Sequence, residues 1–333
     1  MAAPTLASGA ATSTVAAPEA PPPAGSGSRR SRWRSARSRW DVRYMPYVLV
    51  APFFLLFAVF GLYPLGRTLW VSLHDWSLLG SHSWVGLDNY VQLATDERFW
   101  NAVRNTLGIF VLSTVPQLTL ALVLAHVLNR RLRARTFFRL GVLIPNVTSV
   151  AAVGIIFTLI FARDFGIANW LLEAIGLEGI DWQSGRLSSW TAISVMVDWR
   201  WTGFNALILL AAMQAVPRVV YEAAALDGAG SWRQFWSITV PLIRPTLIFV
   251  VIVATIGGVQ LFTEPLLFNY GRIQGGSLNE FQTVAMYIYE TTFTNNYNVG
   301  RGAAISWLLF VIILIFALIN FALVRRSVKG TTS

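Results

Sequence analysis

Six stretches of about twenty apolar residues constrain this chain more than any other feature of its sequence. A helix of about 20 residues crosses a hydrocarbon core of about 30 Å. Hydrophobic residues make up 55% of the 333 residues and charged residues 13%, which is more apolar surface than a soluble fold buries. We therefore predict an all-α integral membrane protein with about six transmembrane helices. The stretches are residues 47–67, 102–128, 138–161, 190–216, 247–269 and 303–324.

The positions of the basic residues predict how these helices are oriented. Four arginines lie between the second and third stretches, Arg139 stands at the start of the third, and Arg325, Arg326 and Lys329 follow the sixth. Because loops rich in Lys and Arg stay on the cytoplasmic side, we expect both termini, and the loops after the second and fourth helices, to be cytoplasmic. The net charge of +10 then reflects membrane topology, and no nucleic-acid partner is predicted.

Residues 1–43 have a different composition from the rest of the chain. They are rich in Ala, Pro, Ser and Gly and end in seven arginines between Arg29 and Arg43. Such a segment buries too little apolar area to offset its ordering entropy, so we predict a disordered cytoplasmic tail lying on anionic membrane lipid. The basic cluster follows polar residues at the N-terminus, which favours an uncleaved anchor over a signal peptide. Residues 44–333 are then the transmembrane domain.

The residues that usually carry catalysis or bind metal are scarce. Cysteine is absent, and the three histidines fit no metal-binding spacing. The single lysine, Lys329, is not followed by Ser or Thr at the start of a helix, as a phosphate-binding loop requires. We predict no metal site, no cofactor and no ATPase site in this chain.

Residues 217–245 contain more structure than a connection between membrane helices needs. Pro217 is suited to open a short helix, and Gly228 and Gly230 are suited to end it. Ser231 with Gln234 three residues later has the pattern of a capping box, which begins a second short helix. The segment is predicted to be a cytoplasmic helix-turn-helix in which Glu222 offers a charge for docking and Gly228 allows another backbone to approach.

This segment resembles the Glu-Ala-Ala (EAA) loop of the permeases of binding-protein-dependent ABC importers. The residues in the family's positions are Glu222, Ala223, Ala224, Asp227, Gly228, Ile238 and Pro241, while Val240 stands where the family usually has Leu. The resemblance extends over most of residues 47–326 and favours the carbohydrate branch of the maltose or multiple-sugar type. Residues 85–90, Asn105, Thr106, Trp201, Gly203 and the stretch 213–217 carry that part of it.

The resemblance implies a type I ABC permease fold and a function. The chain is expected to be the pore-forming subunit of an importer of a sugar, a disaccharide or an oligosaccharide, in a bacterial inner membrane. It implies four kinds of association: a second homologous permease subunit, two copies of an ATPase subunit that bind ATP and Mg, an extracytoplasmic sugar-binding protein, and membrane lipid. The EAA residues would couple the chain to the ATPase.

Polar residues in two of the apolar stretches are candidates for the sugar path. Gly257, Gln260 and Glu264 recur at three- and four-residue spacing in the fifth helix and are therefore expected to share one stripe in its outer half. The fourth stretch brings further polar and aromatic residues to a similar depth. The candidates are Asp198, Trp199, Arg200, Trp201, Asn205, Gln260 and Glu264. In the other interpretation, Asp198 pairs with Arg200 or with another subunit, the tryptophans belong to the interfacial belt, and Gln260 bonds a neighbouring helix.

Two other classes of membrane protein remain as alternatives. An ion-coupled secondary transporter of a small polar solute needs ionisable residues in the membrane, and here these are few: Asp198, Arg200 and Glu264. It also gives no role to the segment 217–245. A membrane enzyme needs a nucleophile and base, or a metal cluster, and neither is evident.

Overall fold

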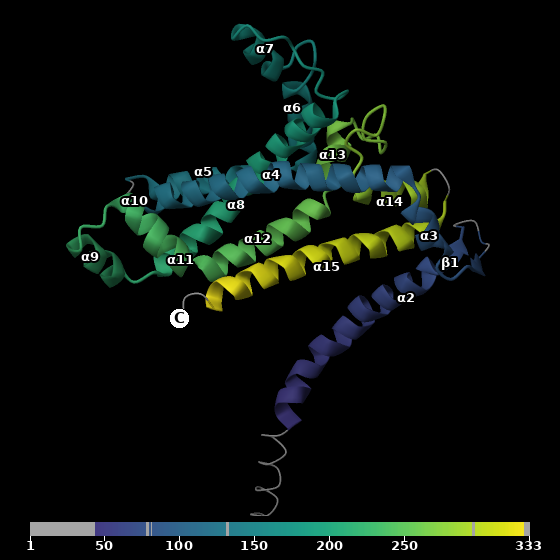
Figure 1. Ribbon diagram of the computed structural model, residues 1–333, viewed down its shortest axis with the longest axis horizontal. Helices are drawn as coiled ribbons and strands as arrows, with labels where there is room; N and C mark the ends of the chain where they lie inside the picture. The colour runs from purple at the N-terminus through teal and green to yellow at the C-terminus, as the bar shows by residue number, and fades with distance from the viewer. Residues whose placement is uncertain (1–43, 78–79, 81, 131–132, 295–296, 330–333) are drawn as a thin grey trace, which may run out of the picture. The chain divides into compact units, whose positions relative to one another are not determined.

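The computed structural model describes residues 44–77, 80, 82–130, 133–294 and 297–329; the tail of residues 1–43 predicted to be disordered lies outside them. The described chain is mainly helical (Figure 1). Three helices are long and apolar enough to cross a membrane alone: Tyr44–Ser72, Glu97–Asn129 and Val299–Asn320. Three bent pairs of helices raise the number to six if each pair is one span. Each of the six predicted stretches overlaps one of these six segments, although the stretch 247–269 continues ten residues beyond Val259.

The chain divides into two compact units, of which the first ends at Pro64. Its described part is a helix that begins at Tyr44 and contains one π-helical turn, η1 (Ala58–Leu62). The helix continues as α2 (Tyr63–Ser72). A π turn widens the helix locally without breaking its backbone hydrogen bonding, so the segment is still a single candidate span.

In the second unit, α4 (Glu97–Asn129) and α8 (Arg186–Ala215) form the most extensive helix pair. Small residues allow the neighbouring side chains and backbones to approach closely. A Cβ atom at Gly108 would lie 2.1 Å from the Trp190 ring, and one at Gly203 would lie 1.9 Å from the Val142 carbonyl oxygen. Such approaches through glycine are typical of packing between membrane helices, where van der Waals contact replaces the hydrophobic effect.

The third predicted helix, residues 138–161, is not continuous. It is divided into α5 (Arg135–Val147) and α6 (Val150–Ile160), which meet at 88°. Pro145 lies in the last turn of α5, and Thr148 and Ser149 have extended backbones. Proline cannot donate a backbone hydrogen bond and clashes with the preceding turn, which explains why the helix ends here.

The fifth predicted helix is also divided. The prediction that Gly257, Gln260 and Glu264 lie on one face of a single helix is therefore wrong. α12 (Arg244–Val259) ends at Gln260, and α13 (Thr263–Phe268) begins three residues later. Pro265 would clash with the carbonyl group of Leu261 if the helix continued. The position of Glu264 therefore does not follow from continuing α12 beyond Gln260.

Three short helices lie between the longer ones: α3 (Asp88–Ala94), α7 (Ile167–Ala174) and α14 (Val284–Phe293). The last helix, α15 (Val299–Lys329), is long. Two three-residue strands, β1 (His74–Trp76) and β2 (His82–Trp84), pair antiparallel, so the all-α prediction is wrong for this hairpin. After α8 come α9 (Arg218–Leu226), α10 (Ser231–Gln234), η2 (Phe235–Thr239) and α11 (Val240–Leu242).

A cluster of polar side chains joins the N-terminal ends of α4 and α15 to α14. Asp96 caps α4 by accepting a hydrogen bond from the Arg98 backbone amide at 2.9 Å. The same carboxylate accepts bonds from the Tyr287 hydroxyl at 2.5 Å and from Arg301 at 2.6 Å. Burial alone would raise the pKa of Asp96, but these bonds outweigh it and hold the pKa below its usual value of 3.8. Burial and the Asp96 carboxylate raise the pKa of Tyr287 to about 12.

The Asp96→Asn variant tests this cluster. Loss of hydrogen bonds to a charged group should lower the free energy of unfolding by about 1–2 kcal/mol at neutral pH. Because the folded-state pKa of Asp96 is lowered, the stabilisation is fully present above the usual pKa and is lost as the pH falls through the folded-state pKa. Thermal unfolding in detergent should therefore show a constant difference at neutral and mildly acidic pH that shrinks below about pH 4. Glu97→Gln is the control, and a difference that persists unchanged in strong acid would contradict the interpretation.

Candidate functional site

The first candidate site is the segment 217–245, in which α9 presents an exposed surface. Val219, Glu222 and Leu226 recur at three- and four-residue spacing on one face of this helix. Leu226 is 90% exposed and Val219 is 71% exposed, and Glu222 is also exposed. An apolar face with one charge on a short polar-flanked helix is suited to docking against another protein.

Gly228 ends α9 in the manner predicted from the sequence. Its φ of +76° is in the left-handed region, where a side chain is strained. The Gly228 amide donates to the Ala225 carbonyl at 3.1 Å, and the Ala229 amide donates to the Ala224 carbonyl at 2.9 Å. These two bonds form a Schellman motif, which satisfies the last carbonyl groups of the helix. No other atom lies within 4 Å of a Cβ built at Gly228, so the space beside it is open.

The second half of the segment is anchored in the helix bundle. Phe235 and Ile243 are 4% and 2% exposed and pack in one cluster with residues of α4, α8 and α12. The Tyr221 hydroxyl lies 3.0 Å from the Thr239 hydroxyl and ties α9 to η2. The segment thus has one exposed helix joined to a second helix that is fixed to the bundle. Ile238 and Pro241 belong to this second part.

The predicted capping box at Ser231 is wrong. Gly230 is the N-cap residue of α10, and Ser231 is already in the first turn. The Gln234 side chain instead donates to the Ala229 carbonyl at 2.8 Å, which closes the turn between α9 and α10. Glycine at the N-cap needs no side-chain bond to adopt the required backbone conformation.

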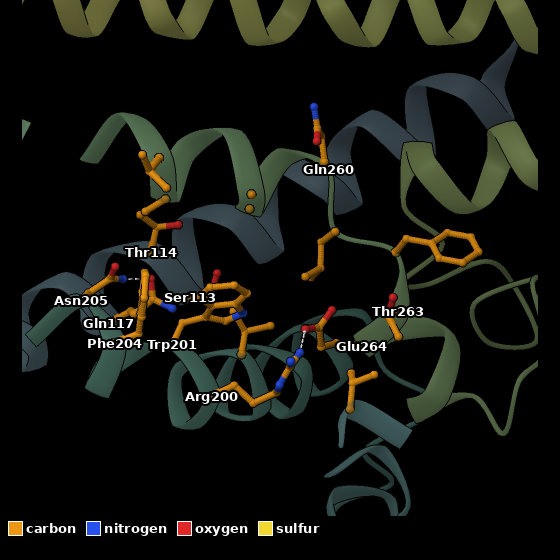
Figure 2. A pocket seen from close by; sticks show the side chains of 18 residues that line it. Ser113, Thr114, Gln117, Arg200, Trp201, Phe204, Asn205, Gln260, Thr263 and Glu264 are labelled. Atoms are coloured by element: carbon orange, nitrogen blue, oxygen red, sulfur yellow. Dashed lines mark hydrogen bonds and ion pairs between the residues drawn. The ribbon is translucent and has the colours of Figure 1, made fainter. Parts of the chain in front are cut away.

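The second candidate site is a cavity of about 380 Å³ within the bundle, shown in Figure 2. It is enclosed by α4, α8, α12, α13 and the break between α12 and α13. Five of the seven predicted path residues line it: Arg200, Trp201, Asn205, Gln260 and Glu264. Gly257 also lines the cavity, although the helix that was expected to align it with Glu264 is broken.

An ion pair between Arg200 of α8 and Glu264 of α13 lies at one side of the cavity (Figure 2). The side chains are 12% and 7% exposed. Their charges compensate each other, which is the usual condition for ionisable groups at membrane depth. Gln260 ends α12 with its side chain directed away from this pair, and it is exposed.

Three polar residues of α4 complete the site, and the sequence reasoning missed them. Gln117 accepts a hydrogen bond from the Asn205 amide at 3.3 Å, and Ser113 and Thr114 line the cavity one turn away. Trp201 and Phe204 of α8 add aromatic rings to the same lining, beside these polar groups (Figure 2). These residues could have been predicted from the sequence, because Ser113, Thr114 and Gln117 are polar residues at helical spacing within an apolar stretch.

Asp198 and Trp199 do not line this cavity. They lie on another face of α8, beside a separate apolar groove that includes Val142 and Pro145 of α5. Trp199 packs against Phe157 with ring centroids 5.6 Å apart. Asp198 does not pair with Arg200, whose partner is Glu264. Within the described residues, no group of three or more His, Cys, Asp or Glu side chains is arranged to hold a metal ion.

The Glu264→Gln variant tests the buried ion pair. It leaves Arg200 in the cavity without its counter-charge, which should lower the free energy of unfolding by about 3–5 kcal/mol. Replacing Arg200 with Gln in the same protein should recover part of this loss. The matched control is Asp181→Asn, which breaks the exposed pair of Arg163 and Asp181 and should change stability by less than about 1 kcal/mol. Thermal unfolding in detergent measures all of these effects, and equal losses in the two single variants would contradict the burial argument.

Comparison with known proteins gives sequence relatives over most of the chain. It is 36% identical to the lactose transport system permease protein LacF of Rhizobium radiobacter over 84% of this chain and 94% of that protein. It is 32% identical to the trehalose/maltose transport system permease protein MalF of Thermococcus litoralis, over 82% of this chain and 91% of that protein. These relatives are transport permeases, so the chain is a transport component and not an enzyme.

A solved structure has the same fold. It is a chain of a bacterial alginate ABC transporter in complex with an alginate pentasaccharide-bound periplasmic protein, with a TM-score of 0.71 and 22% identity over 89% of this chain and 98% of that chain. Residues 117–329 match the family described as binding-protein-dependent transport system inner membrane component. These residues contain the whole of the segment 217–245 and all the described cavity residues except Ser113 and Thr114. The chain therefore belongs to the family of inner membrane components of binding-protein-dependent transport systems.

Proposed function

We propose that this chain is a pore-forming permease subunit of an ATP-driven importer and that its substrate is a disaccharide or oligosaccharide. The observation that carries the proposal is the cavity between α4, α8, α12 and α13, whose lining combines amide side chains with aromatic rings. Sugars present hydroxyl groups along their edges and apolar faces on their rings, so this lining suits them. The named substrates of the relatives, which include lactose and arabinooligosaccharides, support the same class.

The proposed topology has six spans with both termini in the cytoplasm. Each bent pair then counts as one span, and the basic residues that follow α4 and those at the C-terminal end of α15 lie on the cytoplasmic side. The segment 217–245 shares that side, where ATP is present. The ends of α4 and α15 near Asp96 and Arg301 face outward.

We propose that α9 docks on one of two cytoplasmic ATPase subunits, which bind ATP and Mg. A second permease subunit completes the pore, and an extracytoplasmic binding protein delivers the sugar. Support comes from the exposed face of α9 and from the resemblance of Glu222, Ala223 and Gly228 to the coupling loop of ABC permeases. The alginate transporter with its bound periplasmic protein is consistent with the last partner.

An ion-coupled carrier is not supported by the relatives, which are permeases of binding-protein-dependent systems. The cavity also disfavours it. A coupling carboxylate must exchange its ion during each cycle, but Glu264 is already paired with Arg200.

The Gly228→Val variant tests the coupling role of α9. The side chain fills the open space beside the turn and strains the backbone, so docking and sugar uptake should be lost while the helices remain inserted. The matched control is Gly176→Val. Gly176 has a similar φ of +82° and open space around it, but it follows α7, outside the segment 217–245. ATP-dependent uptake into vesicles and copurification of the ATPase are the measurements; normal uptake by the Gly228 variant would refute the assignment.

The Gln260→Ala and Asn205→Ala variants test the cavity as the sugar path. Each removes an amide that can bond a sugar hydroxyl, so we expect uptake at limiting sugar to fall about three- to tenfold. The ATPase should still copurify, because neither residue lies near α9. Gln92→Ala, which removes an exposed amide on α3, is the control. If the double variant transports at the normal rate with unchanged sugar preference, the path lies elsewhere.

A further inference from the structure

A basic pocket lies at the N-terminal end of α4, outside the sugar cavity. Its volume is about 490 Å³, and three arginines line it with a single carboxylate, Glu97. The arginines are Arg98 and Arg104 of α4 and Arg186 at the start of α8. Under the proposed topology, this end of α4 is at the outer surface of the membrane. The lining favours an anionic ligand.

Two of the three arginines are held in place by neighbouring groups. Arg98 donates to Glu290 at 2.7 Å, and that carboxylate is almost fully buried. Arg186 donates to the Asn101 side-chain oxygen at 2.6 Å, and Asn101 in turn donates to the Asn279 carbonyl at 2.8 Å. These contacts fix the pocket wall across α4, α8 and the loop before α14. Because these side chains are already ordered, binding of a ligand costs less conformational entropy.

Arg104 differs from the other two. It is exposed, and it makes no hydrogen bond or ion pair with any described residue. It lies seven residues from Glu97, which places it about 10 Å along the helix from the outer end. A guanidinium at this depth lies at the level of lipid headgroups, where a phosphate is the available partner.

An apolar groove adjoins the basic pocket, and the exposed Trp100 lines both. The groove has a volume of about 400 Å³ and lies between α4 and α15, with Leu107, Val311 and Ile315 among its walls. Trp100, Arg104 and Leu107 recur at four- and three-residue spacing and form one stripe on α4. The stripe therefore leads from the charged pocket to the apolar groove.

We propose that the pocket and groove together bind one anionic phospholipid of the outer leaflet. Its phosphate would lie against Arg104 between the two fixed arginines, and an acyl chain would follow the groove along α15. A free anion would leave the groove empty, and an acidic protein surface would not enter it. Only an amphipathic anion uses both parts of the stripe, which is why we assign the site to a lipid.

The test is retention of lipid by the intact importer complex. The purified complex is stripped of lipid in detergent and titrated with dioleoyl phosphatidylglycerol or dioleoyl phosphatidylcholine, and native mass spectrometry counts the bound molecules. We expect tighter binding of the anionic lipid, about tenfold weaker binding in Arg104→Gln, as for one lost charge-assisted bond, and recovery in Arg104→Lys. Val311→Trp, which fills the groove, should also weaken binding. Arg272→Gln, an equal loss of charge in an exposed loop residue, should not.

Several results would overturn the proposal. Equal retention of the two lipids, or no effect of Arg104→Gln, would show annular lipid only. Equally tight binding of glycerophosphoglycerol, which has no acyl chains, would show a site for free anions. If Val311→Trp disrupts subunit assembly and leaves lipid binding unchanged, the groove is covered by protein.

Discussion

The bilayer requires that every backbone polar group be bonded within the protein, and this constraint governs where the helices of this chain may break. The interruption between α12 and α13 leaves backbone groups of residues 260–262 without helical partners on one side. Thr283 supplies one replacement, because its hydroxyl donates to the Leu261 carbonyl at 2.8 Å. The rest of the break borders the cavity. Irregular backbone at membrane depth is tolerated when it is buried in protein or lines a wet cavity, so the break and the cavity are parts of one arrangement.

The ion pair of Arg200 and Glu264 stabilises that arrangement. It joins α8 to the short helix α13, which has only six residues and cannot hold its position through its own hydrogen bonds. Thr158 of α6 also donates to the carbonyl of Leu267 in α13, at 3.4 Å. α13 is therefore positioned by side chains from two neighbours. The same ion pair gives the cavity two charged side chains whose charges compensate each other, so the lining suits a neutral polar solute.

The sequence predicted some of these features and missed others for identifiable reasons. The apolar stretches and the turn at Gly228 follow from composition and local backbone preference. Three of the stretches form single apolar helices long enough to cross a membrane, and Gly228 ends α9 as predicted. The break before Pro265 was missed because Gln260 and Glu264 were interpreted as polar positions of one continuous helix, and Pro265 was not used as a signal that the helix ends. Asp198 and Arg200 were grouped by depth, yet residues two apart on a helix are about 200° apart around its axis. Helical phase alone would have separated Asp198 from the cavity residues. The pairing of Arg200 with Glu264 joins residues 64 apart and depends on tertiary packing.

The two helices that flank the segment 217–245 are also the ones that carry most of the cavity. α8 brings Arg200, Trp201 and Asn205 to the cavity and ends at Ala215. Only Val216 and Pro217 separate it from α9, which begins at Arg218. α12 begins at Arg244, directly after the anchored Ile243, and reaches the cavity at its far end. From Asn205 to Ala215 the helix rises about 15 Å, and a helix of this length moves as a rigid rod when its end is displaced. In the proposed coupling, docking at α9 would act on both rods through Phe235 and Ile243, which pack in one cluster with residues of α8 and α12. Since the ion pair joins α8 to α13, a shift of α8 would also change the shape of the cavity.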